Sequence, residues 1–149
     1  MSPEGRFTVL MPGPPTEKTE TVDSEHGPYT SHLFTWRDED PERVYLIGWV
    51  DYDPDFNFYH QAEMEANRDN FVTGVGARLL SSYRATIDGY PAIEFTAETA
   101  DKIFKSRVYI VGRRPYQIVI GSPKGMDDSA NVQRFFNSFK VGPGQYHPR

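Results

Sequence analysis

The sequence has 149 residues and no cysteine, which excludes disulfides, thiolate metal sites and cysteine nucleophiles. Its formal net charge of −5 has the wrong sign for general neutralisation of nucleic-acid phosphates, so we expect no nucleic-acid partner. No apolar run approaches the length of a membrane span, so we expect no transmembrane segment. Because no linker or repeat divides the chain, we expect residues 1–149 to form a single domain.

The first third of the chain has the composition of short β-strands separated by turns. Residues 7–11 form a β-rich run that the prolines of 12–15 stop. Residues 16–22 alternate threonine with charged side chains, which is typical of an edge strand, and 29–37 are expected to return antiparallel to them. Residues 44–50 are apolar at both odd and even positions, so this strand is expected to be covered on both faces.

A change of composition at residues 55–77 predicts the first helix, because apolar residues there follow near-helical spacing. Asp55 or Asn57 is expected to cap its start. Gly74 or Gly76 is expected to end it.

Two β-hairpins are expected next. The first joins residues 79–87 to 90–96 through an Asp-Gly dipeptide, which is a strong turn signal. The second joins 103–111 to 116–120 through a Gly-Arg-Arg-Pro turn.

Residues 128–140 carry the clearest helical pattern of the chain. An apolar stripe at i, i+3, i+4 and i+7 is formed by Val132, Phe135, Phe136 and Phe139. The segment must bury this stripe against the sheet. The sequence therefore predicts an α+β fold, in which a mainly antiparallel sheet of about six to eight strands is flanked by two amphipathic helices.

Three alternate carboxylates, Asp51, Asp53 and Asp55, match the opening of a calcium-binding EF-hand loop. The match then fails, because Phe56 replaces the required glycine and Ala62 replaces the bidentate glutamate. We therefore favour an acidic loop between a strand and a helix.

The four histidines show none of the spacings that zinc sites use. Solvated surface histidines are the favoured interpretation, and a zinc site built from His60 and the nearby aspartates is the alternative. Nucleophile-elbow, Walker and dinucleotide-binding motifs do not occur in the sequence, and no pair of carboxylates is singled out. We therefore expect no enzymatic activity and no cofactor.

Basic side chains gather in the second predicted hairpin, at Lys102, Lys105, Arg107, Arg113 and Arg114. The favoured interpretation is that these side chains protect the sheet edge and lay their stems over apolar surface. The alternative is a basic ribbon that binds an acidic partner or a phosphate, with Lys105, Arg107, Arg113 and Arg114 as its contacts.

Aromatic residues are dense around 52–59, and we expect Tyr52, Phe56 and Tyr59 to contribute to a contact surface. Most aromatic residues of the chain are expected to lie in the core.

Four segments form a pattern in chain order: Ser2-Pro3-Glu4-Gly5-Arg6-Phe7-Thr8-Val9 with Met11-Pro12-Gly13, Ile87-Asp88-Gly89-Tyr90-Pro91-Ala92 with Glu94-Phe95, Tyr109-Ile110-Val111-Gly112-Arg113-Arg114-Pro115-Tyr116-Gln117, and Arg134-Phe135-Phe136-Asn137-Ser138-Phe139-Lys140. Together these segments resemble the PsbP-like domains, a superfamily shared with Ran-binding Mog proteins and DcrB-like bacterial lipoproteins. The resemblance implies an α/β/α sandwich and a binding or assembly role without catalytic residues.

The sequence and this resemblance lead to one functional hypothesis and one alternative. We expect a non-catalytic protein-interaction or assembly domain of a bacterial envelope protein, periplasmic or extracellular, whose protein partner is unidentified and whose signal peptide is absent from this chain. The alternative is a carrier of a small ligand or metal ion, with its pocket between helix and sheet.

Overall fold

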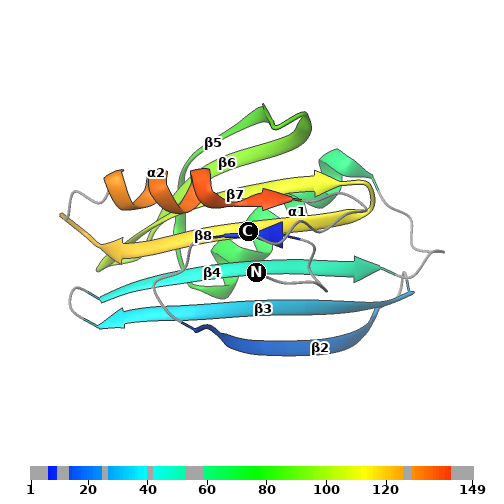
Figure 1. Ribbon diagram of the computed structural model, residues 1–149, viewed down its shortest axis with the longest axis horizontal. Helices are drawn as coiled ribbons and strands as arrows, with labels where there is room; N and C mark the ends of the chain where they lie inside the picture. The colour runs from blue at the N-terminus through cyan, green and yellow to red at the C-terminus, as the bar shows by residue number, and fades with distance from the viewer. Residues whose placement is uncertain are drawn as a thin grey trace.

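The computed structural model describes residues 7–9, 14–24, 27–39, 42–52, 59–125 and 129–141. Its main element is a seven-stranded antiparallel sheet with the order β2-β3-β4-β8-β7-β6-β5 (Figure 1). The strands are β2 (Thr16–Ser24), β3 (Gly27–Glu39), β4 (Glu42–Tyr52), β5 (Arg78–Ile87), β6 (Tyr90–Glu98), β7 (Lys102–Val111) and β8 (Arg114–Pro123). The helices are α1 (His60–Gly74) and α2 (Ser129–Ser138). The prediction of an α+β fold is confirmed, and the number of strands falls within the expected range.

A second, two-stranded sheet pairs β1 (Phe7–Thr8) with β9 (Lys140–Val141). The sequence predicts a strand at the first of these segments but not at the second, which it assigns to the end of the last helix. Neither α1 nor α2, the two helices within the described residues, is long and apolar enough to cross a membrane.

Both predicted hairpins are present. Asp88 and Gly89 have φ angles of 53° and 84°, so the turn between β5 and β6 has positive φ at both central residues, as a type I′ turn requires. The turn between β7 and β8 contains only Gly112 and Arg113, because Val111 pairs with Arg114. The predicted four-residue turn is therefore too long, and its last two residues belong to β8.

Helix α1 begins later than the sequence predicts. Its N-cap residue is Tyr59, which has extended backbone geometry and makes no side-chain capping hydrogen bond. The prediction that Asp55 or Asn57 caps the helix is wrong, and both residues lie outside the described ranges. At the other end Gly74 is the last helical residue, and Gly76 has a φ of 67°, so glycines do mark the end of α1.

One hydrophobic cluster lies between the sheet, β1 and α2. All four residues of the predicted stripe on 128–140 are buried in it. Its members are Phe7, Tyr45, Ile47, Trp49, Ala92, Tyr109, Tyr116, Ile118, Ile120, Val132, Phe135, Phe136 and Phe139. Val132, Phe135 and Phe136 of α2 therefore pack on the sheet as the sequence predicts, and Phe139 does so from the position just after the helix, which ends two residues earlier than predicted.

Two smaller clusters of buried apolar residues lie on the α1 side of the sheet. Met64 of α1 packs with Ile93, Phe95, Val108 and Ile110, and a neighbouring cluster contains Val44, Phe104 and Val119. Because successive residues of a strand point to opposite faces, Val108 and Ile110 face away from Tyr109, which belongs to the α2 cluster. In Figure 1, α2 lies in front of the sheet and α1 passes behind it.

Candidate functional site

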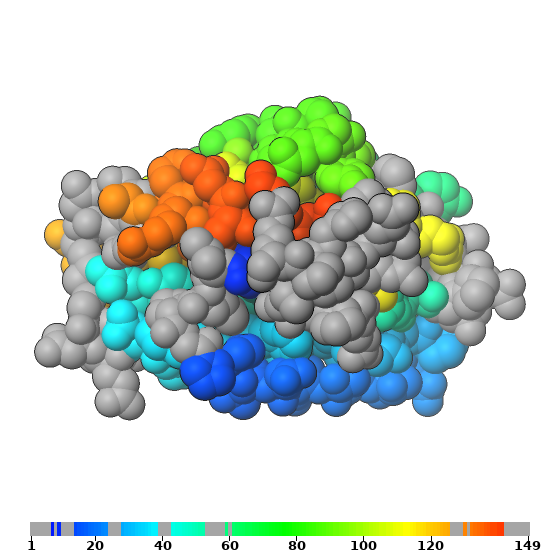
Figure 2. Space-filling model, viewed as in Figure 1, coloured from blue at the N-terminus to red at the C-terminus, as the bar shows by residue number. Residues whose placement is uncertain are grey.

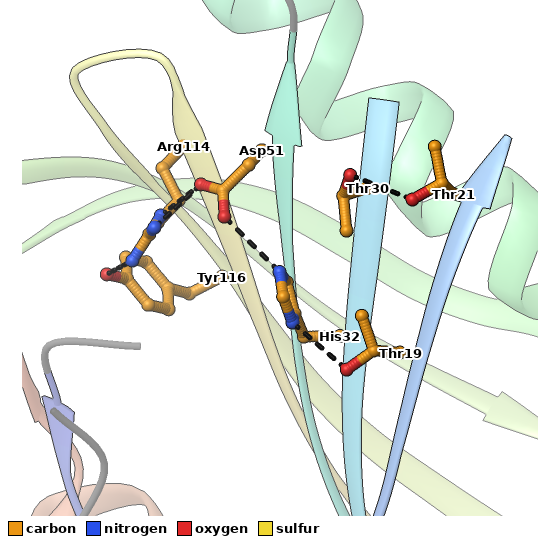
Figure 3. Close-up of polar contacts among 7 residues, drawn as sticks. All are labelled: Thr19, Thr21, Thr30, His32, Asp51, Arg114 and Tyr116. Carbon is orange, nitrogen blue, oxygen red and sulfur yellow. Dashed lines mark hydrogen bonds and ion pairs between the residues drawn. The ribbon is translucent and has the colours of Figure 1, made fainter. Parts of the chain in front are cut away.

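Two segments that the sequence nominates as partner contacts meet at one end of the sheet. Asp51 lies near the end of β4 and Arg114 is the first residue of β8, 63 positions later in the chain. The Arg114 guanidinium donates from Nε to the Asp51 carboxylate at 2.7 Å, and Nη2 lies at the same distance from that carboxylate (Figure 3). This ion pair joins the end of β4 to the turn between β7 and β8.

The second carboxylate oxygen of Asp51 faces a buried histidine. His32 Nε2 lies 3.3 Å from Asp51 Oδ2, and His32 Nδ1 lies 3.4 Å from the Thr19 hydroxyl (Figure 3). The imidazole stacks on Trp49 with a centroid separation of 4.6 Å and is only 6% exposed. The expectation of a solvated surface histidine is therefore wrong for His32, because the strand register places it between β2 and Trp49.

The order of hydroxyl, imidazole and carboxylate in this network is that of a catalytic triad. The Thr19–His32 distance of 3.4 Å is longer than the separation at which a base activates a nucleophile, about 2.6–3.2 Å. Arg114 also neutralises the carboxylate that would have to stabilise a protonated imidazole. The network links side chains of β2, β3, β4 and β8, and a hydrogen bond between the hydroxyls of Thr21 and Thr30 joins β2 to β3 nearby (Figure 3).

The predicted aromatic contacts have different surroundings. Tyr52 donates a hydrogen bond of 2.8 Å to Glu63 in the first turn of α1. Burial, followed by this hydrogen bond, raises the pKa of Tyr52 above its ordinary value, so the phenol stays protonated. Tyr59 is 68% exposed, one residue before α1. Phe56 lies outside the described residues.

Arg107 is held inside the structure rather than presented to solvent. Its guanidinium carbon lies 4.7 Å from the ring centroid of Phe136, its Nε lies 3.3 Å from Glu94, and its Nη1 donates to the Tyr109 hydroxyl at 3.3 Å. Burial acts to lower the pKa of Arg107, but the Tyr109 hydrogen bond and the Glu94 charge outweigh it and raise the pKa. Arg107 therefore stays charged and is neutralised within the fold.

Three further basic residues of the hairpin, Arg114, Lys105 and Arg113, also differ in their surroundings. Arg114 is occupied by Asp51 and by a 3.2 Å hydrogen bond to the Tyr116 hydroxyl. Lys105 and Arg113 have exposed side chains, but they lie apart, since Lys105 is in the middle of β7 and Arg113 is in the turn. The predicted basic ribbon is thus not one surface, and its exposed charge at the end of the sheet comes from Arg113.

A small cavity lies beside β9, next to the turn of the β5–β6 hairpin and to β7. Its volume is about 240 Å³, and its lining consists of Asp88, Tyr90, Tyr109, Phe139, Lys140 and Val141. The side chains of Asp88 and Lys140 lie 3.7 Å apart and carry opposite charges. Within the described part of the chain, no three histidine, aspartate or glutamate side chains gather as a metal site.

No protein-family model matches the chain, and no curated protein is similar to it.

Sequence reasoning did not single out His32, although one pattern in the sequence indicates its burial. Phe34 and Trp36 share its parity along β3, and both pack against the α2 cluster. A period of two along this strand places His32 on the same inward face.

Proposed function

We propose that this chain is a non-catalytic protein-interaction or assembly domain of a bacterial envelope protein, and that its partner docks at the end of the sheet that exposes Tyr59 and Arg113. The observation that carries this proposal is the Asp51–Arg114 ion pair, which joins two segments far apart in sequence into one platform. In this proposal the fold fixes the relative positions of the two segments, and their exposed side chains bind the partner.

The same proposal includes a PsbP-like α/β/α sandwich with two amphipathic helices. It is supported by the separation of the α1 and α2 clusters onto opposite faces of the sheet. The buried phenylalanine stripe of α2 supports an amphipathic α2, and burial of Met64 with partial burial of Phe71 and Val72 supports the same character for α1.

The composition of the platform suits protein recognition. Tyrosine and arginine are the side chains most enriched at interface hot spots, because each combines a large contact area with polar groups. Tyr52 and Arg114 are tied to Glu63 and Asp51, so their segments are already ordered before a partner arrives. Tyr59 and Arg113, whose side chains are exposed at this end of the sheet, would then contact the partner directly.

Site-specific cross-linking tests this proposal directly. A photoreactive phenylalanine analogue at position 59 is expected to form an adduct with a protein of the source cells, whereas the same analogue at Lys18 on β2 is not. Arg113→Glu is expected to lower the yield of the adduct by about tenfold, because it reverses the exposed charge. Equal adduct formation at both positions, or a yield at position 59 that Arg113→Glu leaves unchanged, contradicts the proposal.

A small-ligand carrier is the second candidate, and the cavity of about 240 Å³ beside β9 favours it. Cavities of about 150 Å³ lined by apolar side chains already accept a molecule as small as benzene. Thermal-shift measurements against small aromatic metabolites and divalent cations test this candidate, with Tyr90→Ala as the pocket variant. Flat responses throughout would eliminate it.

A further inference from the structure

The two outer strands of the seven-stranded sheet differ in how they meet solvent. β2 has the sequence TEKTETVDS, in which three acids and a lysine accompany mostly exposed side chains. β5 has the sequence RLLSSYRATI, with two arginines and no acid. It exposes Leu79, Leu80 and Tyr83, whose exposed fractions are 37%, 46% and 57%. In Figure 2, β2 and the β5–β6 hairpin form opposite margins of the same face.

The backbone of β5 has hydrogen-bonding groups that no described strand uses. Thr86 lies opposite Pro91 of β6, and proline has no N–H to donate. Ile87 and Tyr90 flank the two-residue turn and form the hydrogen-bonded pair, and such pairs alternate with non-bonded ones along an antiparallel ladder. The N–H and C=O groups of Thr86, and by the same alternation those of Arg84 and Ser82, therefore point towards the open edge.

The shape of the strand limits where another chain can pair. The register of β5 against β6 shifts between Leu79 and Ser81, which marks a β-bulge. Residues 81–87 keep a regular register with β6, so the open ladder runs along this segment. Leu80 lies at the bulge, beside the start of the ladder.

The side chains of this segment have different chemistry on the two faces of the sheet. Tyr83 and Ala85 share one face, and Arg84 projects from the other. Arg84 is exposed, and within the described ranges it has no ion-pair partner. An added strand would therefore meet an apolar surface on one side and an unneutralised positive charge on the other.

We propose that residues 81–87 of β5 dock an extended acidic segment of another protein, which adds to the sheet as a further strand. The segment places apolar residues beside Tyr83 and Ala85, and it places a carboxylate beside Arg84. Main-chain hydrogen bonds supply affinity and the alternating side chains supply specificity, as in other cases of strand addition. This surface is separate from the one around Tyr59 and Arg113.

A fluorescent synthetic peptide in which valine and glutamate alternate over about seven residues is the probe for this edge. Fluorescence anisotropy is expected to show saturable binding to the full chain. A peptide of the same composition with its glutamates in one run, and one with lysine in place of glutamate, are expected to bind at least about tenfold more weakly.

Two variants separate the backbone and charge contributions. Thr86→Pro removes an N–H that points to the open edge, and it is expected to weaken peptide binding by about tenfold or more. Arg84→Glu leaves the backbone unchanged and is expected to reverse the preference towards the lysine peptide, so it tests the proposal even if Thr86→Pro does not fold. Arg113→Glu is the matched control, and it should leave peptide affinity unchanged.

Three results would overturn the proposal. One is equal binding of the alternating and block peptides, and another is an affinity that Arg84→Glu does not change. The third is that the chain binds no peptide but self-associates in sedimentation experiments, and that Thr86→Pro abolishes this self-association. The strand that pairs with β5 would then belong to a second copy of the chain. Failure of the cross-linking experiment at position 59 would not change peptide binding at β5. The proposed partner surface and the proposed peptide-binding edge can therefore be refuted independently.

Discussion

Gly121 on β8 provides a sharp test of how closely the sheet packs against α1. A Cβ atom built on this glycine would lie 2.7 Å and 2.8 Å from two ring carbons of Phe104, and 2.9 Å from Val44 Cγ1. Favourable contacts between carbon atoms lie at about 3.5–4.0 Å. Gly121→Ala therefore requires the Phe104 ring or Val44 to move, although the φ angle of Gly121 itself does not require glycine.

The expected loss of unfolding free energy in Gly121→Ala follows from the close packing of these neighbouring side chains. Phe104 and Val44 are each 6% exposed, and the Phe104 ring lies 5.5 Å, centroid to centroid, from Phe71 on the α1 side. Adding a methyl group to such a site costs about 1–3 kcal/mol, and we expect about 2 kcal/mol because several atoms must shift together. For a chain of this length that loss lowers the Tm by about 4–8 °C.

Urea denaturation of four proteins measures this cost: the wild type, Gly121→Ala, Phe104→Leu and the double variant. Leucine leaves room for the new methyl group, so the double variant is expected to be at least about 1 kcal/mol more stable than additivity of the single variants predicts. Gly48→Ala is the control, because its nearest atom, the His32 carbonyl oxygen, is 3.4 Å away. Additive costs, or equal costs at Gly121 and Gly48, would refute the reasoning.

Three further predictions concern α2, an ion pair and a turn. Phe139→Ala is expected to cost about 3–5 kcal/mol in urea denaturation, since it removes a ring that is 2% exposed, and a cost below about 1 kcal/mol would contradict its place in the core. Arg78, and then Lys124, lower the pKa of Glu98, so the stability that its charge supplies is present above the ordinary glutamate pKa of about 4.3 and is lost as the pH falls through the folded value. Glu98→Gln should therefore be less stable than the wild type at pH 7, and equal urea midpoints at that pH would refute the assignment. Asp88→Val should lower the Tm because φ at this position is 53°, whereas Asp88→Asn should not, and equal Tm values for the two variants would contradict the strain.

Local patterns in the sequence predict the elements that bury one regular face. The stripe on 128–140 is sufficient to place α2 on the sheet, because helical periodicity by itself defines which side chains must be buried. The Asp88-Gly89 pair is sufficient to place a hairpin, because few residues adopt positive φ at both central positions.

The boundaries of α1 and the strand β9 were not predictable in the same way. α1 begins at His60, and its N-cap residue Tyr59 makes no side-chain capping hydrogen bond, so the capping preferences that suggest Asp55 or Asn57 do not apply to it. β9 exists only because β1, from the other end of the chain, lies beside it, and its two residues carry no strand pattern of their own.

By itself, the sequence determined the α+β class, the hairpins and the inward stripe of α2, because each depends on the spacing of neighbouring residues. Only the tertiary structure decided which basic side chains are enclosed by the fold and which are exposed. Arg107 and Arg113 look alike in sequence, yet strand register places the first between Glu94 and Phe136 and leaves the second in an exposed turn. The surroundings of a charged side chain depend on strands that are distant in sequence. The spacing of residues along the chain does not predict which of these strands will lie beside it.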